Sequence, residues 1–406
     1  MTDTTLVANS SGKLNRKLDA SEAQIVGAKA PDAVRRYLGA FPTYKPTPLV
    51  ELPALADTLG LGAIAVKDEG QRYGLVSFKA LGGAYAVARL VHRHVERKLG
   101  RAVDPAELLG EECKAIAAEM TVACATDGNH GRSVAAGAQM FGCRCVIFVH
   151  SGVSQGRADA IAAFGAEIVR TPGNYDQSVA EATETSAREG WTTVSDMSWE
   201  GYEEIPGLVM QGYTIMLDEI IEQASGSFTH VFVQGGVGGL AAVVAGYFHD
   251  LLESERPQLI VVEPARANCL QRSAMANQRQ AMAPGEATVM AMLECYEPSL
   301  IAWNILEKTA DFFLSIPDGV AIAAIKQLAR PLGSDPMLEI GESGGAGLAG
   351  LMVALEDAGI KAQLGLDGNS RVLLIGTEGA TDAALYQRLI NAPTNEWTPE
   401  HHEAAQ

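Results

Sequence analysis

The sequence predicts an α/β protein built from two α/β domains, and three observations lead to that prediction. Short apolar runs alternate with helical patterns, as is typical of βαβ units and a parallel sheet. The alternation occurs in two series along the chain, so we expect two domains with a cleft between them. The chain has 406 residues, 47% of them hydrophobic, which is enough to bury one large core or two smaller ones.

The first series follows a short strand expected at 63–67. Strands are predicted at 121–125, 144–149, 167–170 and 192–195. Helices are predicted at 79–94, 130–141, 155–164 and 175–188.

The second series starts near residue 200. Helices are predicted at 207–222 and 240–252, and strands at 230–233, 259–262 and 371–375. The first forty residues are polar and weakly patterned, so no element is assigned there.

Charge and cysteine content exclude several classes of protein. The formal net charge is −18, which disfavours nucleic acid and anionic membrane surfaces as partners. The six cysteines include no C-x-x-C spacing, so we expect buried thiols and no metal site. No signal peptide or run of eighteen apolar residues is present, and we expect a cytoplasmic protein.

A lysine at the start of a helix is the first candidate for chemistry. It lies in Ser77-Phe78-Lys79-Ala80-Leu81-Gly82-Gly83. The positive end of a helix dipole lowers the pKa of a lysine placed there, and Schiff-base chemistry needs the neutral amine. Taken alone, this segment is better explained by a solvated helix lysine.

Two loops join a predicted strand to a predicted helix. Thr126-Asp127-Gly128-Asn129-His130-Gly131 offers backbone N–H groups that suit a carboxylate, although ordinary helix capping also accounts for it. Gln234-Gly235-Gly236-Val237-Gly238-Gly239 is typical of a phosphate-binding loop. It also fits a dinucleotide fingerprint, with Glu263 placed to bind a ribose. The glycine loop alone does not choose between these ligands.

Two more candidates follow strands. Asp196 comes directly after the strand at 192–195, at the edge where α/β proteins bind ligands; a turn aspartate is the alternative. Thr377 follows the strand at 371–375 and could offer a hydroxyl to a ring nitrogen or cap a helix.

Taken together, these segments resemble the fold-type II pyridoxal phosphate enzymes, the tryptophan synthase β-subunit and threonine dehydratase group. They occur in that family's order, starting from Pro46-Thr47-Pro48-Leu49, over roughly residues 40–385. Within that family, the motifs are similar to those of the diaminopropionate ammonia-lyases. Their motifs match Lys67-Asp68-Glu69, Thr126 to Arg132, Trp199-Glu200-Gly201-Tyr202-Glu203, Gly341-Glu342-Ser343-Gly344 and Thr377-Glu378-Gly379.

The resemblance implies two open, twisted, mostly parallel sheets with helices on both faces and an active site in the interdomain cleft. It implies a large cofactor-binding domain of residues 1–84 and 200–406, a small domain of residues 85–199, and a homodimer. It further implies elimination from 2,3-diaminopropionate, of either chirality, through a Schiff base on Lys79 and an aminoacrylate that yields pyruvate and ammonia.

The resemblance also assigns roles to single residues. Lys79 and its neighbour Phe78 hold pyridoxal 5'-phosphate, and Asn129 faces its phenolic oxygen. Thr377 faces the pyridine nitrogen, and Asp127 and Asp196 are bases for substrates of opposite chirality. The phosphate is assigned to Gly235, Gly236, Val237, Gly238 and Gly239.

One run departs from the family pattern. Where the family has Gly-Leu-x-Cys-Gly-Glu, this chain has Met292-Leu293-Glu294-Cys295-Tyr296-Glu297. If this run changes the substrate pocket, a serine or threonine dehydratase or a racemase is an alternative function. The dinucleotide pattern leaves room for a nicotinamide-dependent oxidoreductase, but that alternative does not explain Lys79. A non-catalytic amino-acid sensor would be expected to lack Lys79.

Overall fold

The computed structural model describes residues 4–38, 41, 44–126, 128–173 and 175–392, and they form two compact units. The first unit contains the described residues of 1–28, 46–77 and 216–404. The second contains those of 29–45 and 78–215. Each unit has its own sheet, which confirms the predicted α/β class with open sheets.

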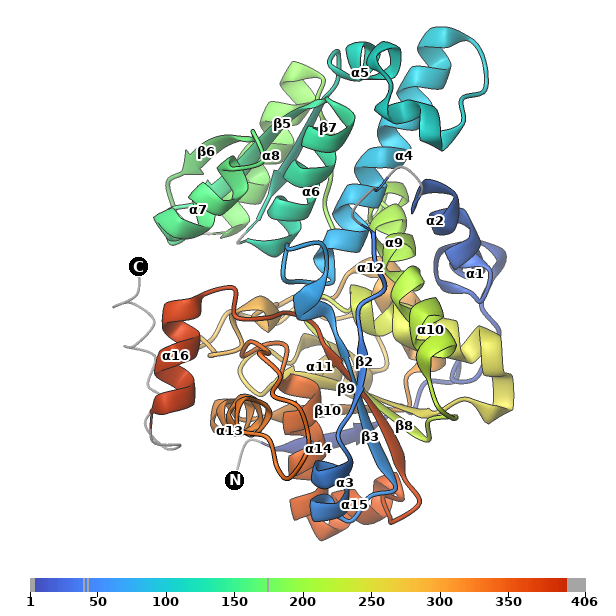
Figure 1. Cartoon of the computed structure of the whole chain (residues 1–406), viewed down its shortest axis with the longest axis vertical. Helices are drawn as coiled ribbons and strands as arrows, with labels where there is room; N and C mark the ends of the chain where they lie inside the picture. The colour runs from blue at the N-terminus through green and yellow to red at the C-terminus, as the bar shows by residue number, and fades with distance from the viewer. Residues whose placement is uncertain (1–3, 39–40, 42–43, 127, 174, 393–406) are drawn as a thin grey trace. The chain divides into compact units, whose positions relative to one another are not determined.

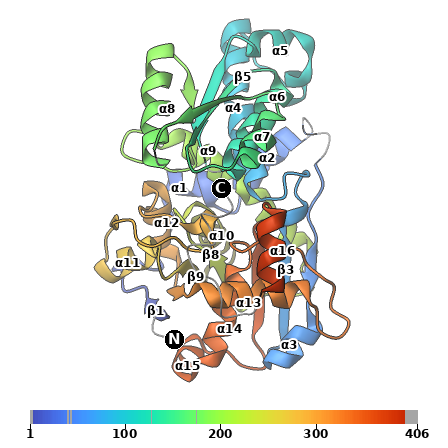
Figure 2. The same cartoon turned by 90° about the vertical axis from the view of Figure 1, so that its left-hand side faces the viewer.

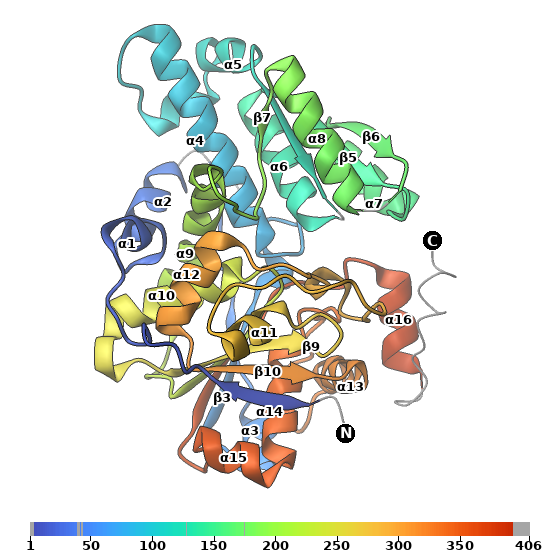
Figure 3. The same cartoon turned by 180° about the vertical axis from the view of Figure 1, so that it is seen from behind.

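The first unit is built on a seven-stranded sheet in the order β1-β10-β9-β8-β11-β3-β2 (Figure 1). Its strands are β1 (Thr5–Ala8), β2 (Leu49–Glu51), β3 (Ala63–Asp68), β8 (His230–Gln234), β9 (Gln258–Pro264), β10 (Phe312–Ile316) and β11 (Arg371–Gly376). The five inner strands are parallel, and the edge strands β1 and β2 pair antiparallel to their neighbours. Figure 3 shows β1 lying along β10. The sheet is therefore mostly parallel, as predicted.

Helices cover both faces of this sheet (Figure 2). They are α1 (Ala20–Val26), α3 (Pro53–Leu59), α10 (Gly239–Leu252), α11 (Cys269–Ala276), α12 (Leu300–Thr309), α13 (Asp318–Ala329), α14 (Ala346–Glu356), α15 (Ala358–Leu364) and α16 (Ala383–Asn391). Because both faces are covered, the inner strands are buried almost throughout, and β8 exposes none of its five residues.

The register brings three strand ends together in the first unit. Leu374 of β11 lies opposite Phe232 of β8, and Gly376 of β11 lies opposite Asp68 of β3. In parallel strands the carboxyl ends lie at the same edge, so the segments that follow β3, β8 and β11 start side by side. The glycine loop follows β8 and Thr377 follows β11.

The second unit has a four-stranded parallel sheet in the order β6-β5-β4-β7. Its strands are β4 (Thr121–Ala125), β5 (Arg144–His150), β6 (Glu167–Thr171) and β7 (Thr192–Thr193). Its helices are α2 (Ala30–Leu38), α4 (Lys79–Leu99), α5 (Glu111–Ala117), α6 (Asn129–Phe141), α7 (Gln155–Ala162) and α8 (Tyr175–Glu189). A further helix, α9 (Glu204–Gln223), begins in this unit and ends in residues of the first.

Helices α4 and α6 of the second unit pack closely because each has a glycine at the contact. A Cβ atom on Gly83 would lie 2.6 Å from the Ser133 hydroxyl, and one on Gly137 would lie 2.9 Å from the Ala84 Cα. The Ser133 hydroxyl accepts the Ala84 N–H at 3.0 Å. This contact fixes the first turns of α4, where Lys79 lies.

Among the described residues, no helix combines the length and the apolar character that a bilayer crossing requires.

Candidate active site

Lys79 and Asp196, both in the second unit, lie in contact. Lys79 is the first residue of α4, and its Nζ forms an ion pair with the Asp196 carboxylate. The two side chains are 25% and 18% exposed, so each is partly open to solvent or a ligand. The Nζ also lies 5.5 Å from the centre of the Phe78 ring, which packs on Tyr213 at 4.8 Å. Two residues 117 positions apart thus form one candidate catalytic pair.

Strand order explains how Asp196 reaches this position. β7 pairs with β4 in parallel, with Thr193 opposite Ala123, so the segments after both strands leave from one sheet edge. Tyr202 then fixes the segment that follows β7. Its hydroxyl donates to the Thr193 carbonyl at 2.8 Å and accepts the Ser195 N–H at 3.1 Å, and its ring stacks on Trp199 at 4.3 Å. Sequence reasoning gave Tyr202 no role beyond its place in a family motif.

The electrostatics of Asp196 depend on its partner. Burial acts to raise the pKa of this carboxyl group, but the Lys79 charge, the nearby His130 and the Lys79 hydrogen bond outweigh it. The pKa of Asp196 is therefore held well below its usual range, and the group is a charged carboxylate at neutral pH. Any process that moves the Lys79 charge away removes the largest influence that lowers this pKa.

The loop before α6 is shaped by Thr126. Its hydroxyl accepts the N–H groups of Gly128 and Gly131, both at 3.1 Å. A Cβ atom on Gly131 would lie 2.2 Å from the Thr126 methyl group, so a side chain there cannot fit without movement. Asn129 follows as the first residue of α6. Asp127, the other predicted base, lies outside the described residues.

His130 serves this loop as a packing residue. Its Nε2 donates to the Val194 carbonyl at 2.9 Å, and burial lowers the pKa of the imidazole. The hydrogen bond links the start of α6 to the segment that carries Asp196. Among the described residues, no group of three or more potential ligands could hold a metal ion.

The glycine loop of the first unit has the backbone shape of an anion site. Gly236 and Gly238 have φ of 64° and 96°, which glycine adopts without strain, and α10 begins at Gly239. The Gly235 and Gly238 N–H groups donate to the Val262 and Gly235 carbonyls at 2.8 and 3.2 Å. The first N–H groups of a helix have no acceptor within it, so other N–H groups at this helix start can serve as donors to an anion. A Cβ atom on Gly236 would find no atom closer than 3.7 Å, which leaves room beside the loop. The donors fit a phosphate group such as that of pyridoxal 5'-phosphate.

Glu263 is not a ribose-binding residue. Its carboxylate is fully buried and accepts the N–H groups of Leu270 and Gln271 at 2.9 and 2.8 Å. It thus satisfies the first turn of α11, and its side chain is turned away from solvent. This arrangement removes the acid on which the dinucleotide alternative depended.

Thr377 begins the segment after β11 and is buried. Gln234, at the end of the neighbouring β8, donates through its side-chain amide to the carbonyls of Gly344 and Ile375, each at 2.7 Å. This buried side chain ties the glycine loop, the Gly341-Glu342-Ser343-Gly344 motif and the Thr377 strand together. The sequence placed Gln234 at the start of the glycine loop but indicated no role for its side chain, because a buried glutamine has no distinctive spacing.

The run from Met292 to Glu297 lies against the glycine loop. The atoms nearest to a Cβ on Gly236 would be the Cys295 sulfur, a Leu293 methyl and the Met292 carbonyl, at 3.7 to 3.8 Å. The added charge of Glu294 is paired locally: it accepts the Tyr296 hydroxyl at 2.8 Å and the Thr288 N–H at 3.2 Å. Glu294 and Tyr296 both differ from the family pattern, and their side chains form a hydrogen bond with each other.

A lysine–carboxylate pair at a helix start and a glycine loop at the carboxyl end of a strand are both features of enzymes that bind an amine and a phosphorylated ligand. The model of the family described as "Pyridoxal-phosphate dependent enzyme" matches residues 40–378. The diaminopropionate ammonia-lyase of Escherichia coli (strain K12) is 40% identical over 355 residues, which cover 86% of this chain and 87% of that protein.

The crystal structure of the Escherichia coli diaminopropionate ammonia lyase in complex with D-serine has a TM-score of 0.86 and 35% identity, over 96% of this chain and 97% of that one. A threonine dehydratase of Arabidopsis thaliana is more distant, with 28% identity over 50% of this chain and 31% of its own length. The chain belongs to the pyridoxal-phosphate dependent enzymes, in the family of the diaminopropionate ammonia-lyases.

Proposed function

We propose that the chain eliminates ammonia from the β-carbon of 2,3-diaminopropionate, of D and L configuration, and releases pyruvate and ammonia. The observation that carries the proposal is the contact of Lys79 with Asp196, since it places an amine and a carboxylate in one site. The family to which the chain belongs, and its similarity over most of the length of the Escherichia coli enzyme, support the same substrate.

Each candidate residue has a task in this reaction. Lys79 holds the cofactor through its amine, the loop from Gly235 to Gly239 binds its phosphate, and Asn129 and Thr377 orient its ring. Within the loop, the Gly235 and Gly238 N–H groups donate to the Val262 and Gly235 carbonyls, so the phosphate falls to the other N–H groups. Pyridoxal 5'-phosphate, when bound, supplies an electron sink for the bond from the substrate α-carbon to hydrogen. The Phe78 ring lies beside the lysine amine.

Proton transfer falls to Lys79 and the two aspartates. Where Lys79 is a neutral amine, no charge on it depresses the pKa of Asp196. Burial, which raises that pKa, then makes Asp196 a more competent base. We assign Asp127 to the opposite face, for the other enantiomer. The β-amine leaves as ammonia after it gains a proton, and the Lys79 ammonium is placed to give one.

A substrate panel on purified protein tests the proposal. We expect pyruvate from D- and L-2,3-diaminopropionate at rates well above those from serine, and no keto acid from a Lys79→Ala variant. Borohydride treatment should attach the cofactor to Lys79, as located by mass spectrometry. A higher rate on serine or threonine would contradict the assigned substrate and favour a dehydratase. Racemisation without keto acid would contradict elimination.

We also propose a cytoplasmic homodimer. The division into residues 1–84 with 200–406 and residues 85–199 stays a prediction, since the compact units of the structure change at residues 77/78 and 215/216 and the second unit also includes residues 29–45. Sedimentation of the purified protein, in which a dimer has about twice the chain mass of 42.8 kDa, tests the assembly.

A further inference from the structure

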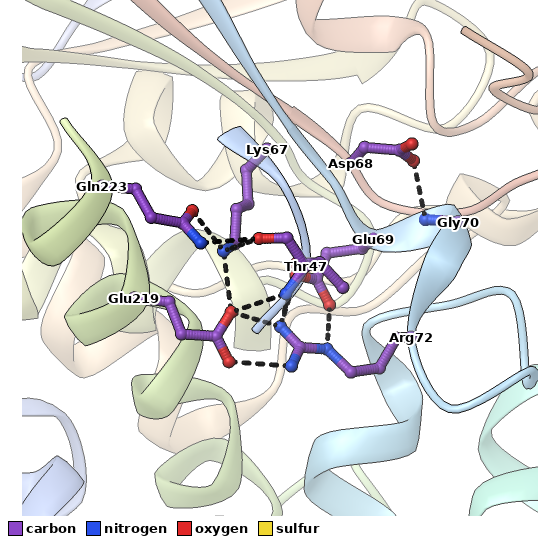
Figure 4. A network of polar contacts seen from close by, with 8 residues as sticks. All are labelled: Thr47, Lys67, Asp68, Glu69, Gly70, Arg72, Glu219 and Gln223. Carbon is purple, nitrogen blue, oxygen red and sulfur yellow. Dashed lines mark hydrogen bonds and ion pairs between the residues drawn. The ribbon is translucent and has the colours of Figure 1, made fainter. Parts of the chain in front are cut away.

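A cluster of buried charged side chains in the first unit joins residues shortly before Lys79 along the chain to Glu219 of α9 (Figure 4). Its centre is Arg72, whose side chain is fully buried. The guanidinium binds Glu69 through Nε and Nη2 at 2.9 and 2.7 Å, and Glu219 through Nη1 and Nη2 at 2.8 and 2.7 Å. Arg72 therefore forms two bidentate contacts, which only the planar fork of arginine can make.

Lys67 completes the cluster. Its Nζ lies 2.7 Å from Glu219 and donates to the Thr47 carbonyl at 2.7 Å. The Thr47 hydroxyl in turn donates to Glu69 at 2.6 Å. Two positive and two negative side chains cancel, so the cluster is neutral. Buried ion pairs of this kind are weak evidence for stability, since apolar side chains could fill the same space. The geometry of these ion pairs instead indicates that the cluster holds a segment of the chain in place.

The cluster fixes the start of a strained segment. Arg72 directly follows a short 3-10 turn, η1 (Glu69–Gln71), and the next residues are Tyr73, Gly74, Leu75, Val76 and Ser77. Tyr73, Gly74 and Val76 have φ of 50°, 69° and 53°. A β-branched residue such as Val76 rarely adopts this left-handed conformation, which persists only where the surroundings enforce it.

The other end of the segment is held as well. The Val76 carbonyl accepts the Gly379 N–H at 2.9 Å, and Ser77 pairs with Glu378 in an antiparallel bridge. Glu378 directly follows Thr377. The chain that leads into Phe78 and Lys79 is thus bound at one end by Arg72 and at the other by the segment after Thr377.

We propose that Arg72 is a positioning residue for the elimination: with Glu69 and Glu219 it holds residues 73–77 in their strained conformation and so sets where Lys79 begins α4. This inference rests on the proposed role of Lys79. Arg72 itself touches no reacting group in it.

The substitution Arg72→Lys tests the inference, because it keeps the charge and removes the fork. We expect kcat on diaminopropionate to fall about tenfold or more while KM changes little, since a small displacement of a reacting group costs rate. The visible absorbance of the bound cofactor should change its pH dependence. In cofactor-free protein, amide hydrogen exchange should rise in the peptide covering residues 73–78.

Arg256→Lys is the matched control. Arg256 also forms a bidentate pair in the first unit, with Asp311 at 2.6 and 2.8 Å, and both side chains are mostly buried. We expect this variant to lose stability without a change in kcat, cofactor absorbance or exchange at 73–78. If both arginine variants lose activity in proportion to stability, Arg72 is only structural and the inference is wrong.

A pair of variants at Val76 keeps the test decisive if Arg72→Lys does not fold. Val76→Ala and Val76→Gly lose nearly the same packing, but only glycine relieves the backbone strain. We expect the glycine variant to have the higher unfolding midpoint and the lower kcat of the two. Equal kcat values would overturn the inference. Failure of the wild-type enzyme to consume diaminopropionate would instead overturn the proposed function, whatever the exchange data show.

Discussion

At the scale of single residues, the contact of Asp196 with Lys79 makes a direct prediction about stereochemistry. Asp196→Asn removes the carboxylate and keeps the shape of the side chain. We expect kcat to fall by about 10² to 10⁴ on one enantiomer of diaminopropionate and much less on the other, as for loss of a general base. Separate assays of pyruvate from the D and L substrates measure it.

The control for this variant is Glu200→Gln, an exposed carboxylate on the same segment, which should leave both rates unchanged. Asp127→Asn should show the reverse preference between the enantiomers. Equal losses on both substrates in Asp196→Asn would mean that the residue holds Lys79 and does not serve as a base for one face.

At the scale of secondary-structure elements, the close contact of α4 with α6 depends on Gly137. Alanine usually stabilises a helix relative to glycine by up to about 1 kcal/mol. Here a Cβ atom would lie 2.9 Å from the Ala84 backbone, so the helices must separate. We expect Gly137→Ala to lower the free energy of unfolding by about 1–3 kcal/mol, as measured by chemical denaturation.

Gly156→Ala gives the comparison, because a Cβ atom there would meet nothing within 4 Å and the residue lies in α7. This variant should be neutral or slightly more stable than the wild type. A stabilised Gly137→Ala protein would show that α4 and α6 can move apart without cost, and the position of Lys79 would then need another explanation.

The capping of α11 by Glu263 predicts a dependence of stability on pH. Burial raises the pKa of Glu263 to about 8 in spite of its two backbone hydrogen bonds. A carboxyl whose pKa is raised in the folded state binds its proton there more tightly than in the unfolded chain. Its contribution to stability is complete below its ordinary pKa, near 4.5, and is lost as the pH rises through about 8.

The Glu263→Gln variant should not show this loss of stability as the pH rises. Between pH 6 and pH 9 we expect the wild-type free energy of unfolding to fall by about 1–3 kcal/mol more than that of the variant. Glu255→Gln, at an exposed position, should follow the wild type. If wild type and Glu263→Gln show parallel pH profiles, the carboxylate stays charged across this range, stabilised by the Leu270 and Gln271 amides.

The same elements show which parts of the fold the sequence can predict and why other parts could not be predicted from it. β4 and β8 were predicted because short apolar runs bounded by turn residues indicate buried strands, and both runs form strands. The sequence did not predict α14, because the helix is buried almost throughout. Its sequence therefore lacks the periodic apolar and polar faces of a half-exposed helix. β1 was missed because it is four residues long and pairs only at the sheet edge.

For the candidate site, motifs predicted the positions of Lys79, Asp196 and the glycine loop. They could not predict the Lys79–Asp196 contact, since it depends on the pairing of β7 with β4. β7 also ends at Thr193, earlier than the predicted 195, because the Tyr202 hydroxyl takes the Ser195 N–H. Contacts of this kind follow from tertiary structure, and no local pattern encodes them.

At the scale of the whole molecule, folding of the first unit requires segments that lie far apart along the chain to pair with one another. The sheet of the first unit combines strands from residues 5–8, 49–68 and 230–376. Its central strands β11 and β3 pair although roughly 300 positions separate them along the chain. Such long-range pairing makes folding slow, because the closure of large loops must precede the contacts that stabilise them.

Removal of the cofactor tests the ligand class on the whole folded chain. A ligand that binds only the folded state raises its stability by RT ln(1 + [L]/Kd), which is about 4 kcal/mol at a thousand times Kd. We therefore expect hydroxylamine-treated protein to have a lower unfolding midpoint, and pyridoxal 5'-phosphate to restore it with increasing concentration.

Inorganic phosphate should restore a smaller part of the unfolding midpoint, because it makes only the phosphate contacts with the N–H groups of the glycine loop. NAD should have no effect, since Glu263 is committed to the α11 amides. A shift with NAD that equals the shift with pyridoxal 5'-phosphate would contradict the assignment of the glycine loop to a single phosphate.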